Sequence, residues 1–248
     1  MFWKNFTKTK NRFLEDQFFR PRWYSVFFNP YFISRYPLYK GIQRFAKSCR
    51  EQEQILDVGC GLKPYRRLFS TLNYLGIDIA GGGHADAAKC VDKYYDGKHI
   101  PYRDESFDVV ICTQVLEHSE EPETVLQEIF RVLKTGGRLY LTVPLVANEH
   151  EIPYDFSRFT QYRLRQLCAA LPAGEVHIAP TTKVFGVCGQ LLSAYLFESI
   201  PFRSTLVKAS FSLIILAPLQ LLALLLDFLI PEGWVTLDYM LLACKQKV

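Results

Sequence analysis

Short apolar runs alternate with helical patterns through the middle of the chain, and this alternation most constrains the possible fold. The runs predicted as strands cover residues 54–59, 73–79, 106–114 and 137–145. Apolar side chains at helical spacing predict helical segments at residues 63–72, 122–134 and 160–171. Such an alternation favours a mainly parallel α/β sheet with helices on both faces, which binds ligands beyond the carboxyl ends of its strands.

The first predicted strand ends in a tight turn with the sequence DVGCG. Gly59 and Gly61 have no Cβ, so the backbone there can turn sharply and approach a ligand closely. Asp57 and Asp78 place carboxylates at the ends of the first two strands, and an acid at the position of Asp78 commonly receives ribose hydroxyls. The dinucleotide fingerprint G-x-G-x-x-G is not completed, because Pro64 stands at its third glycine.

Four ordered segments carry a family resemblance: ILDVGCG, YLGIDI, DGKHIPYRDESFDVVICTQVLEH and PETVLQEIFRVLKTGGRLYLTVP. With them the chain resembles, from about residue 54 to about residue 171, the class I S-adenosylmethionine-dependent methyltransferases, and within these the bacterial type-11 group. The resemblance implies a Rossmann-like seven-stranded sheet with helices on both faces, and S-adenosylmethionine as the cofactor. The chain departs from the family at Lys63, where the first motif usually has a third glycine.

The resemblance also implies which residues bind the cofactor. The residues expected to form the loop against the methionine part are Asp57, Gly59, Cys60 and Gly61. Asp78 would hold the ribose hydroxyls, and Ile79 would lie against the adenine. Asp96, with Gly97 beside it, fits the acid that accepts from the adenine amino group, and Gln114 fits the position near the methionine tail. Asp96 has a second reading, since Asp-Gly pairs often only stabilise a turn.

The expected catalytic segment is NEHEIPYDFSRFT, residues 148–160, directly after the fourth predicted strand. His150 is predicted as the base that takes a proton from the acceptor, because imidazole titrates near neutral pH. Asp155 and Arg158 are predicted to position the acceptor. In the alternative reading, Asp155 and Arg158 form a salt bridge that orders the loop, and His150 caps it.

No metal site is expected from the spacing of potential ligands. The seven cysteines are scattered, with no CxxC and no Cys/His spacing suited to zinc, and they favour a reducing compartment. Glu117 and His118 are expected to cap a helix or to pair with each other. The N-terminus has no apolar run like that of a signal peptide, so the expected location is the cytoplasm.

Residues 209–226 form a run without charged residues, and this run is long enough to be a candidate membrane span. A single span is disfavoured because the following segment reads as a last strand of the same sheet, and Pro218 is expected to kink or break the helix. We expect a helical pair that dips into one leaflet at the inner face of the membrane, with Arg203 and Lys208 near anionic headgroups. A dimer interface or an internally packed helix pair is the alternative.

The expected organisation has four parts: an aromatic and basic N-terminal arm or lid (1–53), a methyltransferase core (54–186), an apolar helical insert (187–232) and a final strand (233–248). The basic arm could favour an anionic surface, or it could simply be solvated.

The predicted function is methyl transfer to a small-molecule, saccharide or lipid-linked acceptor, because no nucleic-acid-binding module is recognisable. The apolar insert favours an amphiphilic acceptor. The alternatives are an inactive membrane-associated scaffold that retains the cofactor fold and a nicotinamide-dependent oxidoreductase, which the missing phosphate turn disfavours. The oligomeric state stays open.

Overall fold

The computed structural model of the protein describes residues 17–81, 89–201, 204–230 and 232–247. The chain divides into two compact units. The sheet unit comprises residues 42–179 and 238–248, and the helical unit comprises the residues up to 41 and residues 180–237. The first sixteen residues of the expected N-terminal arm, and Arg203, lie outside the described residues.

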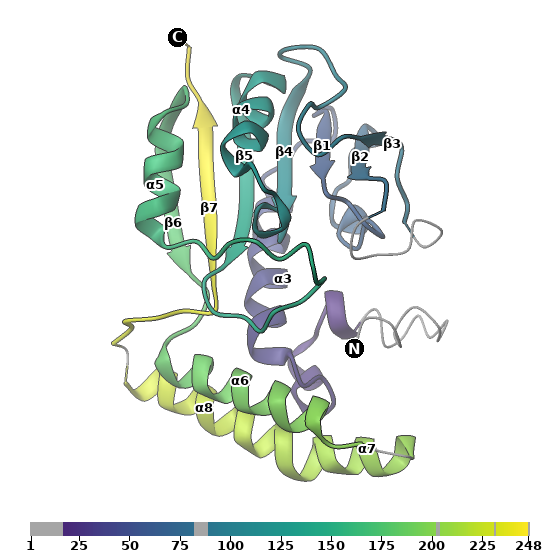
Figure 1. The fold of residues 1–248 in the computed structure, drawn as a ribbon, viewed down its shortest axis with the longest axis vertical. Helices are drawn as coiled ribbons and strands as arrows, with labels where there is room; N and C mark the ends of the chain where they lie inside the picture. Colours follow the sequence, from purple (N-terminus) through teal and green to yellow (C-terminus); the bar gives the residue numbers. More distant parts are fainter. Residues whose placement is uncertain (1–16, 82–88, 202–203, 231, 248) are drawn as a thin grey trace. The chain divides into compact units, whose positions relative to one another are not determined.

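The sheet unit is built on a seven-stranded sheet in the order β3-β2-β1-β4-β5-β7-β6 (Figure 1). Its strands are β1 (Ile55–Val58), β2 (Tyr74–Ile79), β3 (Lys93–Tyr95), β4 (Phe107–Thr113), β5 (Leu133–Pro144), β6 (Ala173–Pro180) and β7 (Asp238–Lys245). Parallel pairs join β3 to β2, β2 to β1, β1 to β4 and β4 to β5, whereas β7 runs antiparallel to β5. The predicted fold class is confirmed, including an apolar helical segment before the last strand. The chain order reverses between β1 and β4, where sheets of this kind bind ligands.

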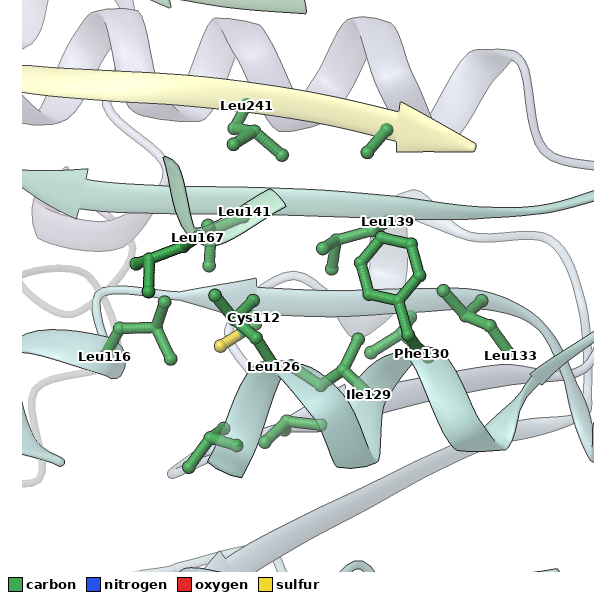
Figure 2. Close-up of a cluster of buried hydrophobic side chains, with 14 of the residues drawn as sticks. Cys112, Leu116, Leu126, Ile129, Phe130, Leu133, Leu139, Leu141, Leu167 and Leu241 are labelled. Atoms are coloured by element: carbon green, nitrogen blue, oxygen red, sulfur yellow. The ribbon is translucent and has the colours of Figure 1, made fainter. Parts of the chain in front are cut away.

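One face of the sheet is covered by apolar side chains of α4 (Pro122–Val132) (Figure 2). Leu126, Ile129 and Phe130 of this helix are buried in one cluster with Leu139 and Leu141 of β5. Leu164 and Leu167 of α5 (Gln161–Ala169) belong to the same cluster. Burying one such side chain contributes about 1.5–3 kcal/mol, so this layer holds the strand ends in fixed positions.

The opposite side chains of β5 meet α3 (Phe32–Lys47), which begins in the helical unit and ends in the sheet unit. Tyr140 stacks on Phe45 with ring centroids 5.0 Å apart. The alternation of Leu139, Tyr140 and Leu141 follows the two-residue period of a strand that is buried on both faces.

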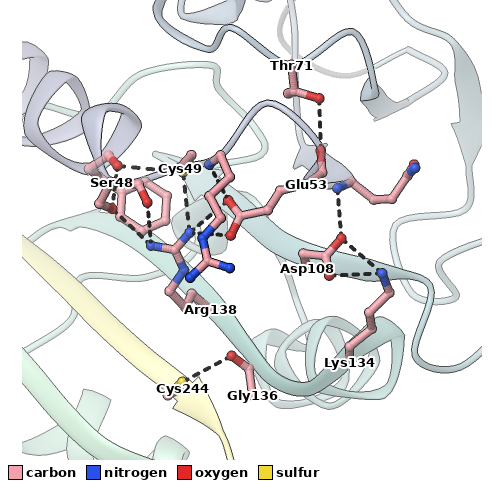
Figure 3. Close-up of polar contacts among 12 residues, drawn as sticks. Ser48, Cys49, Glu53, Thr71, Asp108, Lys134, Gly136, Arg138 and Cys244 are labelled. Carbon is pink, nitrogen blue, oxygen red and sulfur yellow. Dashed lines mark hydrogen bonds and ion pairs between the residues drawn. The ribbon is translucent and has the colours of Figure 1, made fainter.

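A polar network fastens the beginning of β1 to its neighbours (Figure 3). Arg138 Nη2 donates to both carboxylate oxygens of Glu53, at 2.9 and 2.8 Å. Asp108 accepts from the backbone N–H of Gln54 at 2.8 Å and from Lys134 Nζ at 2.9 Å. The network therefore ties β1, β4 and β5 together at the end of the sheet away from the glycine turn.

The structure differs from the sequence-based expectation in several elements. The helical turn or two expected over 63–72 is observed as a single 3-10 turn, η2 (Arg66–Leu68), whereas strands β3 and β6 had no recognised signal. Pro37 lies inside α3. The buried side chains of Ile33 and Leu38 on either side of it anchor the helix, and this packing offsets the lost backbone hydrogen bond.

The helical unit contains an antiparallel pair of long helical segments, visible at the bottom of Figure 1. Its first helix is α6 (Val184–Ser199); the second segment is continuous and comprises α7 (Thr205–Phe211), the π-helical turn η5 (Ser212–Leu216) and α8 (Ala217–Leu229). Pro218 does not break this segment, because it lies in the first turn of α8, just after the π turn. The short 3-10 helix η1 (Trp23–Phe27) also belongs to the unit.

Most buried residues of this pair are small or polar, with Val187, Phe197 and Leu216 as the large apolar ones. A Cβ added at Gly189 would lie 2.4 Å from the Cβ of Ala223, so α6 and α8 approach closely there. Gln220 is fully buried and donates to the carbonyl oxygens of Val26 and Asn29. Asp227 accepts from the backbone N–H groups of Lys183 and Phe185 at 3.0 and 2.9 Å, which caps the start of α6.

The outward face of the second segment is apolar and exposed. Side chains at least 45% exposed include Leu213, Ile214, Leu221, Leu222, Leu225 and Phe228. By length and composition, residues 206–229 could cross a membrane, with a mean hydropathy of 2.3 in their most apolar window and only 28% of that window buried. The segment therefore has the inverse of the pattern normal for a helix in a soluble protein.

Candidate functional site

Asp57 lies in β1, just before the glycine turn, and its side chain is buried. Tyr74 on the neighbouring strand donates its hydroxyl to Asp57 Oδ2 at 2.6 Å. Burial raises the pKa of Asp57 to about 7, although the hydrogen bond from Tyr74 opposes the shift. A cationic group brought against this carboxyl would favour its ionised form.

Two glycines shape the turn after β1. Gly59 has φ +69°, and a Cβ there would lie 2.4 Å from Val115 Cγ2. Gly61 has φ +48°, and a Cβ there would meet nothing within 4 Å. Cys60 between them is buried, and burial raises the pKa of its thiol. The turn thus packs against Val115 on one side and leaves open space beside Gly61.

Asp78 ends β2 beside the same turn. Its Oδ2 accepts from the backbone N–H of Gly61 at 2.8 Å, so the structure brings these two predicted cofactor residues together. Lys89 Nζ lies 3.3 Å from Asp78 Oδ1 and donates to the carbonyl oxygen of Ile79 at 2.7 Å. Ribose hydroxyls at Asp78 would therefore share the carboxylate with Lys89 or displace it.

Lys63, which replaces the family's usual third glycine, directs its side chain across β2. Its backbone has φ +51°, in the left-handed region. Its stem occupies the space over Gly76, where an added Cβ would lie 2.3 Å from Lys63 Cε. Lys63 Nζ pairs with Asp92, whose carboxylate also accepts from the backbone N–H of Gly76 at 2.6 Å. The lysine thus pairs with an acid next to β3.

Asp96 stabilises a turn in this structure. Its Oδ1 accepts from the backbone N–H groups of Lys98 and His99 at 2.8 and 2.7 Å. The hydrogen bond from the His99 N–H, followed by that from Lys98, lowers the pKa of Asp96 to about 2. Gly97 has φ +84°, and a Cβ there would lie 3.3 Å from Ile79 Cγ2. The predicted adenine-binding residues Ile79 and Gly97 are therefore neighbours.

Gln114 directly follows β4 and has φ +56°. Its backbone N–H donates to the carbonyl oxygen of Thr142 at 2.9 Å, and its Nε2 lies 3.3 Å from Thr142 Oγ1. These contacts hold Gln114 near the carboxyl ends of β4 and β5.

The predicted catalytic residues meet in the loop after β5. Arg158 donates to both oxygens of Asp155, at 2.5 and 2.7 Å, and the same carboxylate accepts from the His150 backbone N–H at 3.0 Å. Burial would raise the pKa of Asp155, but these hydrogen bonds lower it to about 2. Burial lowers the pKa of His150. The pair Asp155–Arg158 therefore orders the loop around His150.

Glu117 and His118, in the turn η4 (Leu116–His118), lie against His150. One possible ligand atom of each of the three residues lies within 4.8 Å of the others. The rings of His118 and His150 meet edge to face, 4.8 Å apart. Glu117 is fully buried, which raises the pKa of its carboxyl well above the ordinary value. Sequence reasoning missed this cluster, although β4 and β5 are neighbours and their following loops carry its members.

The residues after β1 and β2 suit S-adenosylmethionine by their chemistry. The cofactor carries an ammonium group, a sulfonium and ribose hydroxyls. Carboxylates of Asp57 and Asp78 and the open backbone at Gly61 match such groups. No structural observation assigns the individual contacts, which stay predictions.

A family model matches part of the sheet unit. Residues 56–141 match the family model described as a methyltransferase domain. A tRNA (carboxymethyluridine(34)-5-O)-methyltransferase of Arabidopsis thaliana is 32% identical over 123 residues, which cover 46% of this chain and 30% of that protein. A ubiquinone biosynthesis O-methyltransferase of Pseudomonas fluorescens is 29% identical over 104 residues, which cover 36% of this chain and 44% of that protein. The chain thus spans less than half the length of these relatives.

Solved structures agree with the sheet topology. The structure of the cyclase SpnF matches with a TM-score of 0.54 at 21% identity, covering 86% of this chain and 82% of that one. Phosphoethanolamine N-methyltransferase 2 of Haemonchus contortus, in complex with S-adenosylmethionine, matches with a TM-score of 0.54 at 14% identity. The match covers 94% of this chain and 60% of that one. Likeness at these identities shows the fold, and the family model identifies a methyltransferase domain in residues 56–141. Residues 56–141 of the sheet unit thus match a methyltransferase domain, and the sheet has the fold of S-adenosylmethionine-dependent methyltransferases.

Proposed function

We propose that the protein transfers a methyl group from S-adenosylmethionine to an amphiphilic acceptor held at a membrane. The observation that carries the first part is the buried carboxyl of Asp57 beside the open glycine turn, within residues that match a methyltransferase domain. When bound, the cofactor supplies a methyl group on a sulfonium. In this proposal Asp57 binds the cofactor's ammonium group, and Asp78 accepts from the ribose hydroxyls.

We place the acceptor beside the loop after β5. Arg158 and Asp155 fix this loop, and His150 is our candidate for the group that receives a proton from the acceptor. If the loop were only a structural element, His150→Gln would keep the wild-type turnover once an acceptor is known. A loss in kcat of about a hundredfold, with cofactor binding unchanged, is the outcome expected for a base.

The helical unit supports an amphiphilic acceptor. Its long segment turns small and polar side chains inward, such as Ala223 and Gln220, and exposes Leu222, Leu225 and Phe228. In water such a surface is unfavourable, because large exposed apolar patches are normally covered by a partner or a membrane. Small residues and buried polar contacts between helices are typical of helices that pack in lipid. The proposal therefore places the protein at the inner face of the membrane, with the helical pair in one leaflet.

Cosedimentation with neutral phosphatidylcholine vesicles tests the membrane part. The full chain is expected to pellet with vesicles, and the double variant Leu222→Glu, Phe228→Glu is expected to stay in solution. The matched control is Leu72→Glu, because Leu72 is 90% exposed in the sheet unit. Pelleting of the double variant at the wild-type level would remove this surface as the attachment site.

A nucleic-acid acceptor is the second candidate function, favoured by the relative named as a tRNA methyltransferase. Radiolabelled S-adenosylmethionine supplied with a membrane lipid extract, or with total tRNA, separates the two acceptors. Label in the lipid fraction supports the first proposal, and label in tRNA replaces it.

Two further outcomes address the remaining alternatives. Cofactor binding without transfer to any acceptor would support an inactive scaffold. Thermal stabilisation by NAD rather than by S-adenosylmethionine would instead favour an oxidoreductase.

A further inference from the structure

We propose that Glu117, His118 and His150 form a binding site for one divalent transition-metal cation. The three side chains come from the turn after β4 and from the loop after β5, and one possible ligand atom of each lies within 4.8 Å of the others. Two imidazole nitrogens and one carboxylate form a donor set that binds Fe²⁺, Co²⁺, Mn²⁺ or Zn²⁺ and leaves coordination positions open.

The buried carboxylate of Glu117 supports a cation at this position. Its side chain is fully buried, and neither of its oxygens has a hydrogen-bond partner among the residues that the structure describes. His118 Nε2 lies 3.9 Å from Glu117 Oε1, which is too long for a hydrogen bond. Buried polar groups are nearly always paired, so an orphaned carboxylate facing imidazoles indicates a missing partner.

The two histidine rings are oriented as in known metal sites. His118 Nδ1 lies 2.7 Å from the carbonyl oxygen of Tyr154, and His150 Nδ1 lies 3.0 Å from that of Asn148. A carbonyl oxygen only accepts, so in each neutral ring Nδ1 carries the proton and Nε2 keeps its lone pair. Metal-binding histidines typically donate their other N–H to a backbone carbonyl or a carboxylate in this way.

The backbone holds the three side chains together before any ion binds. The N–H groups of Phe156 and Ser157 both donate to the carbonyl oxygen of Glu117, at 2.8 and 3.1 Å. His118 and His150 keep side-chain exposures of 15% and 23%, which leaves a path for an ion from solvent. Donors on one zinc-sized ion lie about 3–4 Å apart, so an inward shift of about an ångström would complete the site.

A cation here would deepen the proposed function, on which this role depends. An open coordination position would take a hydroxyl oxygen of the acceptor. Coordination would lower the pKa of that hydroxyl, and its proton would pass to solvent water as the oxygen takes the methyl group. His150 would then serve as a ligand rather than as the proton acceptor.

Titration of the full chain, without tag histidines and after treatment with a chelator, tests the site independently of methyl transfer. With Co²⁺ we expect one equivalent bound at micromolar concentration, with visible bands of nitrogen and oxygen ligation. Thiolate charge-transfer bands are not expected. Both Glu117→Gln and His150→Gln should weaken binding at least about tenfold. The matched control is His177→Gln, because His177 pairs with Glu175 at 3.2 Å on the exposed strand β6.

The proposal fails if the folded wild type binds no Co²⁺ below about 1 mM, or if either ligand variant binds as tightly as the wild type. Circular dichroism establishes that each protein is folded, and His150→Gln changes a loop residue, so it remains informative if Glu117→Gln does not fold. Calorimetry with S-adenosylmethionine on the same samples keeps the two hypotheses apart. Cofactor binding without Co²⁺ binding overturns this inference alone.

Discussion

Asp57 is buried and is also expected to face the cationic end of the cofactor. Burial favours its neutral form, and a nearby ammonium favours its ionised form. With a pKa of about 7 in the free protein, Asp57 changes its ionisation state in the range where enzymes are usually studied. Cofactor binding and the stability of the free protein should therefore depend on pH in opposite directions.

We predict that S-adenosylmethionine binds roughly tenfold more weakly at pH 6 than at pH 7.5. Below pH 7 the carboxyl must lose its proton before it can pair with the ammonium, and each pH unit costs about a factor of ten. The dissociation constant from isothermal titration calorimetry is the measurement. Asp57→Asn should bind weakly at both pH values, and a wild type whose affinity is the same at both would contradict the predicted ion pair.

The stability of the free protein should change with the opposite sign. The pKa of Asp57 is higher in the folded than in the unfolded protein. Its contribution to the free energy of unfolding is therefore fully present below the unfolded pKa of about 3.9 and is lost as the pH rises through about 7. The free energy of unfolding of the wild type, relative to Asp57→Asn, should therefore fall between pH 5 and pH 8. Urea titrations of both proteins measure this difference, and a flat difference would mean that Asp57 is not protonated in the folded state.

Sequence reasoning could place residues at strand ends but not their partners. Asp57, Gly59 and Asp78 follow from the strand pattern and the family motif, because a parallel sheet gathers its carboxyl ends at one edge. The contact of Lys89 with Asp78 joins residues whose approach depends on the folded loop. Likewise, Glu117 and His150 are 33 positions apart in sequence and meet only because β4 and β5 are neighbours.

At the scale of elements, strong periodicity and clear ends made a segment predictable. The helix expected at 122–134 is observed as α4, with Pro122 in its first turn, and Thr160 caps α5 by accepting from the Arg163 N–H at 3.2 Å. The edge strands β3 and β6 are short or exposed and lack a run of apolar residues, so their sequences carried little signal. Their pairing with neighbouring strands, rather than local propensity, makes them strands.

The close approach of α6 and α8 gives a prediction about the helical unit. Gly189→Ala should destabilise the helical unit by about 1–3 kcal/mol, because its new Cβ would lie 2.4 Å from that of Ala223. Adding Ala223→Gly removes the clashing group and should restore most of the loss. Chemical unfolding followed by circular dichroism measures both variants, and a coupling energy near zero would show that the helices do not meet at this point.

The cap of α6 gives a further prediction about this unit. Asp227→Ala removes the acceptor for the backbone N–H groups of Lys183 and Phe185 and should cost about 1–2 kcal/mol in the free energy of unfolding. Asp227→Asn keeps an acceptor oxygen and should cost clearly less. The midpoint of urea unfolding compares the two variants; equal losses would assign the effect to charge rather than to capping.

For the whole molecule, the question is which force would attach it to a membrane. The net charge is only +4, and four of the eleven basic residues among the first fifty lie outside the described part of the chain. The exposed leucine face of the helical unit carries no comparable charge and would act through burial of apolar surface. The two forces differ in how they respond to salt.

We predict that binding to neutral vesicles changes by less than about twofold between 0.1 and 1 M sodium chloride. The screening length falls from about 10 Å to about 3 Å over this range, which removes long-range attraction between charges but leaves apolar burial intact. Flotation of the full chain with phosphatidylcholine vesicles measures the bound fraction at each salt concentration. A need for anionic lipid, together with release at 1 M salt, would assign attachment to basic residues. Gln220 faces inward while leucines face outward, and this arrangement is favourable when lipid covers the leucines. If basic residues alone attached the protein, the inward position of Gln220 would need another explanation.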